Sequence, residues 1–215
     1  CRYNRFAATD EHTYKNFKYR ILDDNTAEIC GYTGKNAVVT VPDSIDSKPV
    51  TSIGRTAFYS GKIKEVTIPN TVRSIKWWAF YGCESLEKIN LNFGLKTVGY
   101  GAFMNCKNLK SVSIPMSVTQ ICDDSFAVSC STKKGVFDTY SKQTISTQQY
   151  STDSSFTLEG YSGTVAEKYC NDNSLNFVSS GNVIYGDVNN NGTVEAADAK
   201  LAKSLIDTVP VSYTH

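Results

Sequence analysis

Oxygen-bearing side chains alternate near the C-terminal end of this sequence, at a spacing that suits a hard metal ion. Asp187, Asn189 and Asn191 occupy every second position, Gly192 follows them, and Asp198 lies eleven residues after Asp187. A twelve-residue calcium loop uses positions 1, 3, 5 and 12 for oxygen ligands, with a glycine at position 6 for its sharp turn. The pattern therefore predicts a Ca²⁺ site within residues 187–198.

Two further positions of this loop can help to complete the six to eight oxygen ligands that Ca²⁺ prefers. We expect the residue at position 7 to offer its backbone carbonyl and the residue at position 9 to act through a water. The predicted metal ligands are Asp187, Asn189, Asn191, Thr193, Glu195 and Asp198.

The loop differs in two ways from a helix–loop–helix calcium site. Position 12 is aspartate rather than a bidentate glutamate, and no helical pattern precedes Asp187. A helix with Leu201, Leu205 and Ile206 on one side is expected after the loop. The alternative is a surface turn that binds nothing, because turns also use Asp, Asn and Gly. The spacing together with the following helix favours the metal site.

A second candidate site is aromatic. Trp77 and Trp78 are adjacent in what reads as a polar turn, where they could stack on sugar rings or anchor a protein partner. Tyr59, Tyr81 and Tyr100 would extend an aromatic strip along the same side. The alternative is that one tryptophan packs against the neighbouring repeat.

Few residues of this sequence could form a catalytic site. The two histidines, His12 and His215, both lie near an end of the chain, although histidine is the usual general base near neutral pH. Adjacent aspartates occur only at 23–24 and 123–124, where turns are expected. We therefore expect a non-catalytic protein. A polysaccharide hydrolase that uses Asp123 is the least favoured alternative.

Composition excludes further classes of protein. The sequence has 22 Lys+Arg and 21 Asp+Glu, a net charge of +1, so no overall basic surface favours nucleic acid. No stretch approaches the ~20 apolar residues that span a bilayer. The seven cysteines form no Cys-x-x-Cys pair, so a zinc site lacks its spacing. We expect mostly buried thiols, with a bridge between Cys122 and Cys130 as the open alternative.

The elements that must position these residues are set by an internal repeat. Phe58, Phe80, Phe103 and Phe126 recur at spacings of 22, 23 and 23 residues. Each unit continues into alternating apolar and polar positions, which predict a half-buried strand that a proline ends in two of the units. Because one unit cannot bury its apolar face alone, stacked units must share a core. The aligned strand triples are Ile63-Val66-Ile68, Leu86-Ile89-Leu91 and Leu109-Val112-Ile114.

The segments on either side of the repeats predict caps. Thr164 with Glu167 three residues later predicts a capping box that opens a short helix from Val165 to about Asn173. The other expected elements are a β-hairpin over 14–34 that turns at 23–25, an opening half-repeat over 37–50, a degenerate repeat with a long loop over 131–155, and strands over 156–163 and 175–180.

The repeat units TSIGRTAFYSG, RSIKWWAFYGC and KTVGYGAFMNC, with the strands that follow them, resemble the leucine-rich repeats of the BspA-like (Treponema pallidum type) family. Units of that family read roughly I-G-x-x-A-F-x-x-C-x-x-L-x-x-I-x-I-P, and the resemblance covers about 37–130. It implies an α+β fold, a β-rich solenoid with short helices. It also implies that Cys83 and Cys106 occupy a structural cysteine column that faces one layer of the core.

The calcium loop and its helix resemble a dockerin half-motif, D-x-N-x-D-G-x-x-x-x-x-D followed by a helix. Asn191 stands where that family usually has Asp, which removes one negative charge. A dockerin normally has two such half-motifs and 209–215 holds no second one, so the chain is either truncated or a half-module. The resemblance implies a cohesin domain of a cellulosomal scaffoldin as partner. The implied cohesin contacts are Ala196, Ala197, Lys200, Leu201, Ser204 and Leu205.

These observations predict three parts: a cap and opening half-repeat over 1–50, leucine-rich repeats with a closing unit over 51–180, and a dockerin segment over 183–215. We expect a secreted, cellulosome-associated recognition or adhesion protein, whose signal peptide was removed before this numbering begins. The repeats would present a surface for a protein or a plant polysaccharide. The main alternative is a carbohydrate-binding module that uses Trp77, Trp78 and Tyr100.

Overall fold

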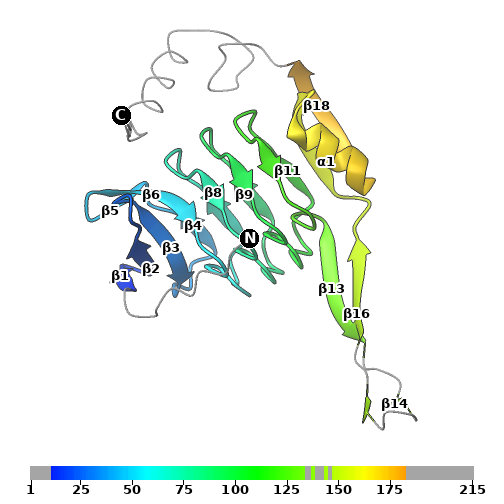
Figure 1. The fold of residues 1–215 in the computed structure, drawn as a ribbon, viewed down its shortest axis with the longest axis horizontal. Helices are drawn as coiled ribbons and strands as arrows, with labels where there is room; N and C mark the ends of the chain where they lie inside the picture. Colours follow the sequence, from blue (N-terminus) through cyan, green and yellow to red (C-terminus); the bar gives the residue numbers. More distant parts are fainter. Residues whose placement is uncertain (1–10, 134–136, 139–142, 145–146, 183–215) are drawn as a thin grey trace, which may run out of the picture.

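The computed structural model describes residues 11–133, 137–138, 143–144 and 147–182, which form a β-rich solenoid of stacked turns (Figure 1). The predicted repeat solenoid is confirmed. The part of the chain that the structure describes contains one helix, where the resemblance implies several short ones. No helix in that part is long and apolar enough to cross a membrane.

Two parallel ladders run along the solenoid, one on each side of its core. In the first ladder Ile53, Ile75, Val98 and Ile121 lie in register on successive turns. These are the apolar positions that keep step with the phenylalanines in the sequence. The strands of the first ladder are β6 (Lys48–Ile53), β8 (Ser74–Ile75), β10 (Thr97–Val98) and β12 (Gln120–Ile121), and β5 (Ser44–Ile45) pairs antiparallel with β6.

The second ladder is built from the alternating apolar triples. Its central residues are buried while their neighbours face outward, as a half-buried strand requires. Two of these strands end just before Ile68-Pro69 and Ile114-Pro115, where the sequence predicts their ends. The strands of this ladder form two consecutive three-stranded sheets, the first of β4 (Val38–Thr40), β7 (Glu65–Thr67) and β9 (Lys88–Asn90), the second of β11 (Ser111–Ser113), β17 (Thr157–Ser162) and β18 (Asn176–Asn182).

A column of aromatic rings forms the centre of the core. Phe58, Phe80, Phe103 and Phe126 stack nearly parallel, with centroids 4.8, 5.1 and 4.9 Å apart. Phe156 continues the column 5.9 Å beyond Phe126. The 22–23-residue spacing therefore places one buried ring on each turn, and the turns share one continuous core.

An antiparallel hairpin covers the N-terminal end of the solenoid, as the sequence predicts. Its turn places Asn25 in the left-handed region at φ +61°, and the Asp24 carboxylate accepts the Thr26 backbone N–H at 3.0 Å. The second hairpin strand pairs in parallel with β6, so the cap continues the first ladder. The cap strands are β1 (His12–Tyr14), β2 (Phe17–Ile21) and β3 (Ala27–Tyr32).

A buried carboxylate joins this cap to the repeats. The side chain of Glu28 on β3 is 2% exposed and contacts Arg20 and Lys76. It also accepts a hydrogen bond from the Ser52 hydroxyl at 2.7 Å. A Cβ at Gly54 would lie 2.9 Å from the carboxylate, so glycine leaves the space for this cluster.

The prediction of a degenerate repeat with a long loop over 131–155 is wrong. The segment contains a β-hairpin that projects from the side of the solenoid (Figure 1). Strand β17 pairs in parallel with β11 across this insertion, so the ladder continues without it. The hairpin strands are β13 (Val128–Lys133) and β16 (Thr147–Thr152), with β14 (Phe137–Asp138) paired to β15 (Gln143–Thr144) beyond them.

Helix α1 (Val165–Asn173) has the predicted bounds, and its Tyr169 meets Phe126 of the phenylalanine column edge-on. The predicted capping box is wrong. The Thr164 hydroxyl donates to the carbonyl of Tyr161, and the Glu167 carboxylate accepts the backbone N–H of Gly163 at 2.7 Å. Strand β18 then closes the second ladder in parallel with β17, as expected.

The six cysteines that the structure describes are all free thiols, so the bridge between Cys122 and Cys130 is not formed. Cys83 and Cys106 are buried, as the resemblance implies. Their thiols donate to the carbonyls of Phe58 and Phe80 on the preceding turns, at 2.9 and 3.2 Å. Burial raises the pKa of Cys83 to about 12, so this column is structural rather than reactive.

Candidate functional site

The predicted calcium and cohesin residues lie outside the described residues. Among the residues that the structure describes, no group of three or more His, Cys, Asp or Glu could hold a metal ion. The residues concerned are Asp187, Asn189, Asn191, Thr193, Glu195, Asp198, Ala196, Ala197, Lys200, Leu201, Ser204 and Leu205.

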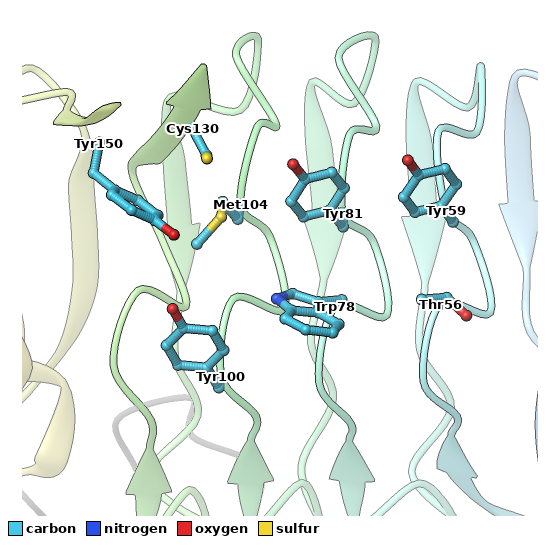
Figure 2. A pocket seen from close by; sticks show the side chains of 8 residues that line it. All are labelled: Thr56, Tyr59, Trp78, Tyr81, Tyr100, Met104, Cys130 and Tyr150. Carbon is cyan, nitrogen blue, oxygen red and sulfur yellow. The ribbon is translucent and has the colours of Figure 1, made fainter. Parts of the chain in front are cut away.

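A cavity of about 260 Å³ opens on one side of the solenoid, and we call it the aromatic pocket (Figure 2). The turns that precede and follow the buried phenylalanines supply most of its lining, and the projecting hairpin supplies the rest. None of the eight lining side chains carries a formal charge at neutral pH. The lining residues are Thr56, Tyr59, Trp78, Tyr81, Tyr100, Met104, Cys130 and Tyr150.

Trp78 stands at a turn position with a left-handed backbone. Its φ is +56°, and the equivalent residues of the other turns, Thr56, Gly101 and Asp124, have φ values of +57°, +58° and +54°. Left-handed backbone is uncommon for a bulky side chain. A Cβ at Gly101 would lie 2.7 Å from the Trp78 ring, so the glycine on the next turn makes room for the indole.

Residues on both neighbouring turns hold the indole of Trp78. The Arg55 guanidinium lies over its ring at 4.8 Å from the centroid, a cation–π contact. The Tyr100 ring meets it nearly edge-on, at 6.2 Å and 69°. The sequence alternative in which one tryptophan packs against the neighbouring repeat therefore describes Trp78, which also lines the pocket.

Tyr59 and Tyr81 form the opposite side of the aromatic pocket (Figure 2). Their rings are stacked at 5.5 Å and 2°, one residue after the phenylalanine column. The next residue in this position is Met104, which is buried. Tyr150 of β16 contributes a 51% exposed ring from the hairpin.

Three tyrosines of the pocket, Tyr81, Tyr100 and Tyr150, have pKa values raised further above neutral pH. A hydrogen bond to the Asp124 carboxylate, together with burial, raises the pKa of Tyr100 to about 12. Burial also raises the pKa of Tyr81 and of Tyr150. The pocket is therefore neutral, with aromatic faces and phenolic hydroxyls as its recognition groups.

The structure brings together only part of the aromatic platform that the sequence predicts. Trp78 and Tyr100 line the pocket, whereas Trp77 is 39% exposed and lies outside that lining. Sequence reasoning missed Thr56, Met104, Cys130 and Tyr150. The column of Tyr59, Tyr81 and Met104 is readable from the repeat period, but Tyr150 lies in an aperiodic segment.

A stack of parallel turns that shares one core and leaves a long exposed surface defines the chain as a solenoid repeat protein. Residues 39–157, more than half of the chain, match the BspA type leucine rich repeat region in six copies. The chain therefore belongs to the BspA type leucine-rich repeat family.

Solved structures agree with this assignment. A leucine-rich repeat protein from Bacteroides capillosus is 31% identical, with a TM-score of 0.51 over 53% of this chain and 88% of that one. The Treponema pallidum leucine rich repeat protein is 34% identical, with a TM-score of 0.52 over 55% of this chain and 56% of that one.

A leucine rich cell surface protein from Faecalibacterium prausnitzii is also 34% identical, with a TM-score of 0.50 over 54% of this chain and 33% of that one. The matched part thus spans about half of the T. pallidum protein and a third of the F. prausnitzii protein. No curated protein matches the chain.

Proposed function

We propose that this chain is a non-catalytic recognition or adhesion protein whose repeat solenoid supplies the interaction surface. The observation that carries the proposal is the BspA-type solenoid itself, a row of turns with an aromatic pocket on its exposed side. Repeat proteins use such extended surfaces for binding. The leucine-rich repeat relatives support a binding role rather than bond cleavage.

The proposal includes attachment through residues 183–215. The donor set of 187–198, carboxylate and amide oxygens at alternate positions, fits Ca²⁺ by its chemistry. Asp187 and Asp198 would hold the ion between them with Asn189 and Asn191. With the ion bound, the helix expected after the loop would present Leu201 to a cohesin of a cellulosomal scaffoldin.

We place this activity outside the cell. The F. prausnitzii neighbour is a cell surface protein, and a cohesin partner would also be extracellular. In this proposal the chain divides into a cap over 1–50, the repeats over 51–180 and the attachment segment over 183–215.

Titration calorimetry of the full chain against a panel of cohesins tests the attachment. Binding is expected in calcium and is lost in excess chelator. Asp187→Ala should abolish it, whereas Asn190→Ala, at a loop position without a ligand role, should leave it unchanged. Calcium uptake without binding to any cohesin would overturn the proposed attachment. The function would then reside in the repeats alone.

A further inference from the structure

We infer that the aromatic pocket binds a neutral pyranose unit of a polysaccharide. This inference names a ligand class for the recognition surface proposed above, and it rests on that proposal. It does not require the attachment segment, because every residue that carries it lies between Thr56 and Tyr150.

The pocket occupies the place of a missing ring. Tyr59 and Tyr81 are stacked on successive turns, and a third ring would continue their column on the next turn. Met104 stands there instead and is 3% exposed, so it forms the floor of a space rather than a third layer. Figure 2 shows Tyr81 and Tyr150 on either side of Met104.

The lining matches the chemistry of a sugar ring. A pyranose has faces of C–H groups that pack against aromatic faces, and a rim of hydroxyls. Five of the eight lining side chains end in a hydroxyl, which both donates and accepts hydrogen bonds. The Tyr100 hydroxyl donates to the Asp124 carboxylate and the Thr56 hydroxyl donates to the Arg55 carbonyl at 2.7 Å, so both offer a ligand their acceptor lone pairs, to which sugar hydroxyls can donate.

Two other ligand classes fit less well. An acidic ligand would find no cationic group among the eight lining residues. A proline-rich peptide also binds aromatic grooves. Its carbonyls only accept hydrogen bonds, however, and the Tyr100 hydroxyl already donates its proton to Asp124, whereas a sugar hydroxyl can donate to the Tyr100 oxygen.

The indole of Trp78 is a second observation in favour of a site. The left-handed backbone itself belongs to the repeat, because Thr56 and Asp124 share it on other turns, but the indole is particular to this turn. The equivalent residue of the next turn is Gly101, so the solenoid does not need an indole there. Trp78 is instead clamped by Arg55 and Tyr100, which fixes its ring at the pocket.

Affinity electrophoresis and calorimetry of the full chain test this inference. The probes are mixed-linkage β-glucan, galactomannan, acidic polygalacturonate and a proline-rich decapeptide. We expect binding to at least one neutral polysaccharide and no binding to polygalacturonate or the peptide. Absence of neutral polysaccharide binding, or binding of the peptide alone, would overturn the inference.

Three variants locate the site. Trp78→Gly suits the left-handed backbone and should fold, yet it should weaken polysaccharide binding at least tenfold. Gly101→Ala should weaken binding as well, because its methyl group would displace the indole. Trp77→Ala should leave binding within twofold, since Trp77 lies outside the pocket lining.

Cohesin titrations of the same samples separate this inference from the attachment. Trp78→Gly should bind cohesin like the wild type and unfold at a similar temperature. Equal loss of polysaccharide binding in Trp77→Ala and Trp78→Gly would contradict the pocket and favour a surface platform of two tryptophans.

Discussion

At the scale of single residues, Glu28 shows how a charge is kept inside this solenoid. Burial raises the pKa of its carboxyl, but the hydrogen bond and charge of Lys76, the Ser52 hydroxyl and the charge of Arg20 outweigh burial and lower it below the ordinary 4.5. The ionised form therefore stabilises the junction between the cap and the first turns.

Replacing this carboxylate should destabilise the protein. Glu28→Gln should lower the free energy of unfolding by about 2 kcal/mol at pH 7, because Arg20 and Lys76 lose a buried partner. Urea unfolding measures this. Glu84→Gln, in an exposed pair with Lys107, is the control and should cost no more than about 0.5 kcal/mol.

The stability difference between the wild type and Glu28→Gln should depend on pH. The pKa of Glu28 is lower in the folded than in the unfolded chain, so its contribution is present above about pH 4.5 and is lost as pH falls through the folded pKa. The difference between wild type and Glu28→Gln should therefore shrink below pH 4. A difference that grows on acidification would contradict this account.

At the scale of elements, the repeat turns follow from the sequence, but the projecting hairpin does not. Each turn is recognisable in the sequence by a phenylalanine and an alternating apolar triple, so the register of the turns and their core could both be predicted. Residues 131–155 lack an apolar period, because their two-stranded ribbon leaves the solenoid instead of building its core. Tyr150 reaches the pocket from that ribbon, so this wall of the site could not be predicted.

The capping box failed for a local reason. The Thr164 hydroxyl bonds backward to Tyr161 and cannot also cap the helix, and Glu167 takes the N–H of Gly163. The predicted bounds of the helix are nevertheless correct, and the helix ends at Asn173, before Ser174 in the left-handed cap conformation at φ +55°.

The hairpin should be dispensable for the fold. Because β17 pairs with β11 across the insertion, replacing 132–148 with Asn-Gly should leave the solenoid intact and change Tm by only a few degrees. Differential scanning calorimetry checks this. Loss of a cooperative transition would show instead that the removed residues support the core.

At the scale of the whole molecule, the phenylalanine column couples the turns into one unit. Phe103 is 1% exposed and stacks on rings of both neighbouring turns. Phe103→Ala should therefore lower the free energy of unfolding by about 3–5 kcal/mol. Val38→Ala, at a side chain that is 61% exposed, should change it by less than about 0.5 kcal/mol.

Unfolding of the wild type followed by circular dichroism and by tryptophan fluorescence should give one coincident transition. Each turn is stabilised by its neighbours, so Phe103→Ala should destabilise the turns on both sides of Phe103 together. Two separate transitions in the wild type would mean that the turns are not coupled through the column.

The central claim is that one chain joins a recognition surface to a calcium-dependent attachment. The direct measurement is retention of labelled cohesin on a column of immobilised neutral polysaccharide that carries the bound chain. The account predicts retention in calcium, and release of cohesin but not of the chain when chelator is added. Cohesin that passes through in calcium while the chain stays bound would contradict it, as would release of the chain itself by the chelator.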